Sequence, residues 1–445
     1  MTASVDNMQA SNAADSEKAQ PESNVQIQSK PSNKRKLLII LAAFMLNFSG
    51  CGLLFSFGLY QSLYEDMARK EDNPFTGASS AEISLIGSIA AAMMKLGAPY
   101  VVAWCKYFSP QRVVFVGGIV YGVASVLASF GKELWHFQTY TRVLGWHWHL
   151  SVLYAIYGNS TSLVWKIPWS QHGDHLSWNW YWRSRCICTA LICASGSVLS
   201  WEPKMAANFH EDNLKHSWVS GSLKVPLPPR KIVCTRKFVA QSLNAIFQSA
   251  AYYTPIFYIA AYSKTLGYSD SDGSNFTALS NACNAIGKVG VGFVADKIGR
   301  LDSFFLTTLL SSVSTAGLWI PSTLLGATNE TSGKGLFIGS TVLYGLFASA
   351  NIGLFSPALV ELFGLEDMPR MTGIMYSLQG AAGFVGTPVA GVLVKSAGSL
   401  SSENYLYMAV FVGTLMVAST VTVLWARVEF MLERIEGQKK WLWRL

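Results

Sequence analysis

Long apolar stretches constrain this chain more than any other feature of its sequence. A hydrocarbon layer of about 30 Å is crossed by a helix of about 20 residues, so each stretch is long enough to span a bilayer. The stretches lie near residues 37–59, 82–104, 113–130, 238–262, 276–295, 303–325, 335–358, 371–395 and 405–426. Hydrophobic residues make up 51% of the 445 residues and charged residues only 13%, which excludes an ordinary soluble domain. We therefore expect an all-α membrane protein.

The distribution of charge predicts how the chain is oriented. A basic cluster at residues 30–36 precedes the first stretch, and Lys and Arg favour the cytoplasmic side of a membrane. We therefore expect cytoplasmic N- and C-termini. The loop after the first span, with Glu65 and Asp66, and the glycosylation sequon at Asn329 then lie on the opposite side. This alternation explains the net charge of +8 better than nucleic-acid binding, for which the chain shows no motif.

A short polar motif separates two of the apolar stretches. It contains Gly292, Asp296, Lys297, Gly299 and Arg300, directly between the stretches at 276–295 and 303–325. Small residues let two helix ends approach closely, and charges at the bilayer surface cost little because water and headgroups reach them. Two spans joined by such a tight turn are typical of a membrane transporter.

This motif resembles the loop signature of the major facilitator superfamily. The resemblance implies that its five residues form a cytoplasmic gate. Less specific motifs occur at 56–61, 255–258, 284–288, 361–364 and 380–388. Their order and spacing resemble those of the monocarboxylate-transporter-like branch of this superfamily. The resemblance covers about residues 37–130 and 226–427. It implies a bundle of 12 transmembrane helices in two six-helix lobes, which alternately open a midplane site to either side.

The resemblance also divides the chain into segments. The proline-rich stretch around Pro226 cannot continue a helix and marks the linker between the lobes. We expect a disordered cytoplasmic tail (1–36), N-lobe helices 1–3 (37–143), an anomalous segment (144–224), a cytoplasmic linker (225–237), C-lobe helices 7–12 (238–427) and a cytoplasmic tail (428–445).

The anomalous segment fits neither a membrane span nor a usual loop. Seven of the 15 tryptophans lie between Trp146 and Trp182, and they alternate with histidines at 146–149 and with other polar or aromatic residues at 178–182. Paired histidines as metal ligands are one explanation of this segment, but metal ligation would need a more regular ligand spacing. An aromatic belt at the membrane interface is a second explanation. A reading frame displaced by one base turns tryptophan codons into glycine codons and restores glycine-rich apolar sequence. We interpret the segment as a shifted reading frame, with helices 4–6 garbled or missing in this chain.

Two lysines inside the expected spans are the leading candidates for substrate binding, because an ionisable group in a membrane is costly. The resemblance implies that Lys288 binds a substrate carboxylate, and Lys95 is the second buried cation. A lysine that extends to lipid phosphates is the alternative reading of each. The polar residues on the spans are Asn244, Gln248, Asn284, Asn351, Tyr376 and Gln379. We place Asn284, Tyr376 and Gln379 in the substrate site, although helix–helix hydrogen bonds also explain such residues.

These features predict a secondary active transporter of a small organic anion, a monocarboxylate, in the plasma membrane or a vacuolar-type membrane. The resemblance implies proton coupling, although the sequence supplies no clear intramembrane acid. No catalytic constellation, cofactor motif or metal-ligand pattern occurs, so we expect no enzyme activity, no cofactor and no metal. The alternative is a non-transporting membrane protein: a nutrient sensor, or the inactive product of a damaged or mispredicted gene.

Overall fold

The computed structural model describes residues 54–70, 75–97, 228–364, 367–395 and 401–442, and scattered positions between 116 and 139. The predicted tail 1–36, most of the first predicted span and the segment 144–224 lie outside these residues. The main elements are α3 (Phe57–Ala68), α4 (Ser80–Leu96), α11 (Arg230–Val233), α12 (Arg236–Thr265), α13 (Asp270–Ile298), α14 (Arg300–Ser312), the π-helix η2 (Val313–Trp319), α15 (Ile320–Leu325), α16 (Glu330–Phe363), α17 (Met368–Val392), the 3₁₀ turn η3 (Ser402–Tyr405) and α18 (Leu406–Leu442). Every one of these is helical, as predicted.

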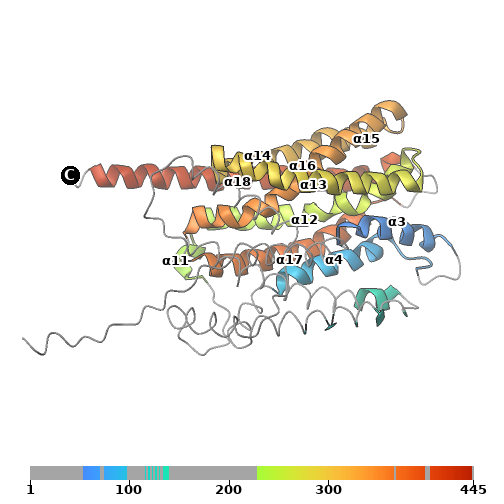
Figure 1. The fold of residues 1–445 in the computed structure, drawn as a ribbon, viewed down its shortest axis with the longest axis horizontal. Helices are drawn as coiled ribbons and strands as arrows, with labels where there is room; N and C mark the ends of the chain where they lie inside the picture. Colours follow the sequence, from blue (N-terminus) through green and yellow to red (C-terminus); the bar gives the residue numbers. More distant parts are fainter. Residues whose placement is uncertain are drawn as a thin grey trace, which may run out of the picture. The chain divides into compact units, whose positions relative to one another are not determined.

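The long helices run side by side along a common direction (Figure 1). Helix α12 packs against α13, α17 and α18, and α16 packs against α13 and α14. The short helices α3 and α4 lie on the C-terminal bundle, α3 against α12 and α4 against α17. We call this contact of α3 and α4 with α12 and α17 the seam.

Local sequence explains where the helices begin and end. Ser79 and Glu82 form a reciprocal capping box at the start of α4, and Ser269 and Asp272 do the same at the start of α13. Gly299 joins α13 to α14 with φ +100° and Gly364 ends α16 with φ +83°. Glycine suits both positions because a side chain is strained at positive φ.

Three helical segments of the described chain are long and apolar enough to cross a membrane: Arg300–Leu325, Glu330–Phe363 and Ser402–Ile435. The predicted spans at 238–262, 276–295 and 371–395 form α12, α13 and α17, which are 30, 29 and 25 residues long. Polar residues within these three helices lower their mean hydropathy. The total of 12 membrane helices stays a prediction.

Some boundaries differ from those expected. Glu65 and Asp66 were expected in a loop, but they lie in α3, which continues to Ala68. The expected C-terminal tail begins as a continuation of α18, which ends only at Leu442. A helix can continue into a polar segment after its apolar stretch has ended. Helix ends predicted from hydropathy alone therefore come too early in the chain.

Candidate substrate-binding site

Glycines in α17 bring three helices into close contact. A Cβ atom at Gly380 would lie 2.8 Å from Leu96 Cγ, and one at Gly391 would lie 2.8 Å from Ala81 Cα, both in the region of α4. On another face, a Cβ atom at Gly386 would lie 2.2 Å from the carbonyl oxygen of Ala250 in α12. Small residues at these positions let helix backbones approach closely. The glycine run at 380–386 thus helps to build the seam.

Lys95 lies in the seam, on the last turn of α4. Its Nζ donates a hydrogen bond to Ser249 Oγ (3.0 Å) and lies 5.4 Å from the centre of the Tyr253 ring, both on α12. Ser249 Oγ in turn donates to the backbone oxygen of Gln379 on α17 (2.7 Å). Within the described residues, no carboxylate forms an ion pair with Lys95. The ammonium group is therefore held by a hydroxyl and an aromatic face, and its charge is not neutralised there.

Polar side chains from three other helices, α12, α16 and α17, surround this lysine. They line a small cavity of about 10 Å³ together with Tyr252, Ile352 and Phe355. The polar members are Lys95, Gln248, Ser249, Asn351, Tyr376 and Gln379. A space of this size holds about one water molecule, so the seam is closed around the site.

Several of these groups are already oriented by hydrogen bonds. Gln248 Oε1 accepts from Ser419 Oγ (2.9 Å), and Asn351 Nδ2 donates to Thr308 Oγ1 (3.0 Å). Gln248 Nε2 is buried and has no hydrogen-bond partner among the described residues. A buried donor without an acceptor is unfavourable, so this amide is available to an acceptor that enters the cavity.

Two of the predicted substrate residues lie elsewhere. Lys288, on α13, has its Nζ 5.5 Å from the centre of the Phe55 ring, just before α3. Asn284 is buried, and its backbone oxygen accepts from Ser349 Oγ of α16 at 3.5 Å. The structure therefore brings Lys95, Tyr376 and Gln379 together, while Lys288 and Asn284 do not line their cavity.

The predicted gate residues mark a sharp turn. Gly299 supplies the positive φ between α13 and α14, Asp296 and Lys297 are exposed on the last turns of α13, and Arg300 begins α14. A Cβ atom at Gly292 would meet nothing within 4 Å in the described chain, and the expected close helix approach there stays a prediction. The sequence analysis missed an ion pair nearby, between Arg427 Nε of α18 and Asp302 Oδ1 of α14 (2.5 Å).

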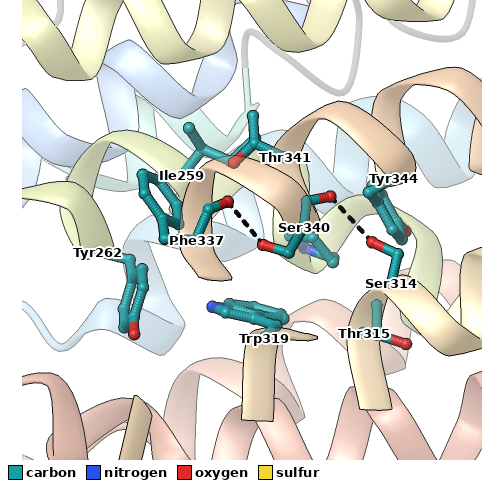
Figure 2. Close-up of a pocket in the computed structure, with 10 residues that line it drawn as sticks. Ile259, Tyr262, Ser314, Thr315, Trp319, Phe337, Ser340, Thr341 and Tyr344 are labelled. Atoms are coloured by element: carbon teal, nitrogen blue, oxygen red, sulfur yellow. Dashed lines mark hydrogen bonds between the residues drawn. The ribbon is translucent and has the colours of Figure 1, made fainter. Parts of the chain in front are cut away.

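A second small cavity, of about 20 Å³, lies between α12, η2 and α16 (Figure 2). Ser314 Oγ donates to the backbone oxygen of Ser340 (2.9 Å), and Ser340 Oγ donates to that of Phe337 (2.8 Å). Aromatic rings of Tyr262 and Trp319 close its other sides (Figure 2). Sequence reasoning missed this cavity, because serine and threonine in a span are common packing residues.

Comparisons with known proteins are consistent with this arrangement. Residues 238–440 match the family model of the Major Facilitator Superfamily. The comparisons support the major facilitator superfamily. An MFS-type transporter of Gibberella moniliformis (strain M3125 / FGSC 7600) is 24% identical over 404 residues, covering 85% of this chain and 88% of that protein. The agnestins efflux protein AgnL12 of Paecilomyces divaricatus is 22% identical over 417 residues, covering 89% and 88%.

The fold is also similar to that of a solved superfamily member. The crystal structure of the nucleoside transporter NupG matches with a TM-score of 0.54 at 12% identity, over 86% of this chain and 99% of that one. The superfamily consists of multi-pass membrane proteins. The comparisons therefore point to a membrane transporter and not to an enzyme. In the described residues, no group of three or more His, Cys, Asp and Glu side chains is placed to hold a metal ion.

Proposed function

We propose that this protein is a secondary transporter of a small organic anion, a monocarboxylate, and that Lys95 binds the carboxylate. The observation that carries the proposal is the environment of Lys95: a lysine in the seam, without a carboxylate partner among the described residues, surrounded by amide and hydroxyl groups. An ammonium group in such a place is costly unless an anion binds it. One substrate carboxylate would neutralise it.

The neighbouring residues suit a carboxylate as well. Gln248 Nε2 has no partner in the described chain, and Tyr376, which also lines the cavity, has its hydroxyl 3.3 Å from Ser356 Oγ. Both are donors that a second carboxylate oxygen accepts from readily. Because the cavity holds only about one water molecule, the seam must open for a substrate to enter, as alternating access requires.

Uptake by reconstituted vesicles tests the proposal, with radiolabelled pyruvate as the probe. We expect Lys95→Ala to lower uptake about ten- to a hundredfold, since a hydrogen bond to a charged group contributes about 1.5–3 kcal/mol. Lys395→Ala is the matched control, because Lys395 also lies over a tyrosine ring, Tyr407 at 4.7 Å, but is exposed. Equal uptake by wild type and Lys95→Ala would remove the carboxylate role of this lysine.

Lys288→Ala in the same assay separates the two candidate cations. If the carboxylate binds at Lys95, Lys288→Ala keeps most of the uptake, because Lys288 does not line that cavity. A large loss in Lys288→Ala with normal uptake in Lys95→Ala would move the site to α13.

Export of a larger organic product is the second candidate. Its support is a relative named as an efflux protein for agnestins, aligned over 89% of this chain. The two candidate functions require substrate cavities of different size once the seam opens. Competition of labelled pyruvate by unlabelled carboxylates of increasing size distinguishes them: efficient competition only by carboxylates larger than pyruvate favours export of a larger product.

A further inference from the structure

The clearest acid that the transport proposal leaves unused is Glu65, near the end of α3. Its residue exposure is only 9%, although a carboxylate is rarely buried without a partner. Gln61 Nε2, one turn earlier, donates to Glu65 Oε1 (2.8 Å) and also lies 3.3 Å from the backbone oxygen of Ser80. Glu65 lies six positions beyond the predicted end of the first span at residue 59 and faces the start of α4.

Among the described residues, two tyrosines from α12 and η3 also lie near Glu65. Tyr258 OH, on α12, donates to the backbone oxygen of Ser80 (3.1 Å), and the Tyr405 ring of η3 lies 6.2 Å from the Tyr258 ring. Both tyrosines are titratable groups that interact electrostatically with Glu65.

None of the charged side chains near Glu65 in the described chain forms an ion pair with it. The charged neighbours along the chain are Asp66 of α3 and Arg69, which follows this helix directly and is exposed. The Lys264 ammonium of α12 pairs with Asp66 and with Asp270 Oδ1 (2.7 Å), not with Glu65. Within the described chain, Glu65 has no ion-pair partner. Its carboxyl is therefore buried mainly among neutral groups, where the protonated form is favoured.

The Gln61 amide can serve both charge states of this carboxyl. Gln61 is fully buried, and its Oε1 has no hydrogen-bond partner among the described residues. The amide nitrogen donates to an ionised Glu65, as the structure shows. A protonated Glu65 has one O–H to donate, and the unpaired Oε1 is an acceptor on the same side chain. The pair is thus built to hold a proton as well as to release it.

We propose that Glu65 is a proton-binding site, which takes up a proton when α3 and α4 close on α12 and η3, and releases it when this end opens. The inference rests on the proposed alternating-access function and supplies the acid that proton coupling needs. In the closed structure, burial raises the pKa of Glu65 above its ordinary value, against the smaller opposing effects of the Gln61 and Ser80 hydrogen bonds and of Arg69. The proton moves between the carboxylate oxygen and water at the opened end, and no other bond changes.

The sign of the pH effect follows from this shift. Since the closed state binds the proton more tightly than an open or unfolded state does, protonation stabilises closure. Closure is favoured below the ordinary pKa of glutamate, and this contribution is lost as the pH rises through the raised pKa of the buried group.

Infrared difference spectroscopy of the purified full-length protein tests proton binding directly, without any transport substrate. We expect the wild type to show the C=O band of a protonated carboxylic acid that disappears, as the pH rises, above the ordinary range of glutamate titration. Glu65→Gln should lose this band, and Glu403→Gln, which changes an exposed acid of η3, should keep it. A band unchanged in Glu65→Gln overturns the inference.

Transport then separates this inference from the transport proposal. In vesicles loaded with pyruvate, Glu65→Gln should retain pyruvate exchange but lose the acceleration of net uptake by an imposed pH gradient. Wild-type vesicles that exchange no pyruvate, with the infrared band lost in Glu65→Gln, would contradict the transport proposal and leave the proton site standing. Full acceleration by the gradient in Glu65→Gln would overturn the proton site and leave transport standing.

Discussion

Two glycines one turn apart on α13 have opposite surroundings. A Cβ atom at Gly287 would lie 1.9 Å from the carbonyl oxygen of Leu346 on α16, whereas one at Gly290 would meet nothing within 4 Å in the described chain. The first glycine is required by the contact of two backbones, which cannot move apart without loss of packing. The second lies on an open face of the helix.

We predict that Gly287→Ala lowers the free energy of unfolding by about 1–3 kcal/mol, since overpacking a close contact forces the backbones apart. Gly290→Ala serves as the control and should be neutral or stabilising, because alanine favours a helix over glycine by up to about 1 kcal/mol. Thermal unfolding of the detergent-solubilised protein measures both. Equal transition temperatures for the two variants would contradict the close contact of α13 with α16.

Helices α12 and α18 are joined by a hydrogen-bond chain rather than by apolar packing alone. Asn244 Nδ2 donates to Ser419 Oγ (2.8 Å), and Ser419 Oγ donates to Gln248 Oε1 (2.9 Å). All three side chains are buried, and Gln248 also lines the Lys95 cavity. The chain therefore connects the orientation of a candidate substrate ligand to the packing of α18.

Removal of the central hydroxyl tests this connection. Ser419→Ala should lower the free energy of unfolding by about 0.6–1.7 kcal/mol for each hydrogen bond lost, the range found between membrane helices. Because Gln248 is then no longer oriented, pyruvate uptake should also fall. Thr422→Ala is the control, since Thr422 Oγ1 bonds only to the backbone of its own helix in the described chain, at Ser419 O (2.8 Å). A Ser419→Ala protein with unchanged uptake would show that the chain is only structural.

The arrangement of the whole chain in the membrane depends on charges at the helix ends. The sequon Asn329-Glu330-Thr331 lies at the start of α16, and Asn329 caps this helix by accepting from the backbone N–H of Ser332 (3.2 Å). The predicted topology, with cytoplasmic termini, places Asn329 on the side where glycans are attached. Glu65 and the Lys264 ion pairs would then lie at the same, non-cytoplasmic end of the seam.

Expression in a eukaryotic host tests this topology through glycosylation at Asn329. We expect Asn329→Gln to remove one glycan, seen as a faster-migrating band that glycosidase treatment of the wild type reproduces in part or whole. Thr331→Ala should have the same effect because it destroys the sequon, and Ser332→Ala should not. Identical migration of wild type and Asn329→Gln would argue for the opposite orientation.

The segment 144–224 lies outside the described residues, and its interpretation as a shifted frame stays a prediction. Sequencing the transcript across these codons decides it. A restored frame would complete helices 4–6, and stop codons in the displaced frame would refute the hypothesis.

Most of the described helices were predictable from the sequence alone, because bilayer thickness sets the length of an apolar helix. Local residues such as Ser79 and Gly299 set where a helix begins or ends. The superfamily followed from short motifs of fixed spacing. The meeting of Lys95 with Ser249, 154 positions apart, was not predictable. Glycines of α17 let this helix pack closely against both α4 and α12, and hydropathy carries no information about which helix faces pack together. For the same reason, the sequence predicted Glu65 in a polar loop, whereas tertiary packing buries its side chain.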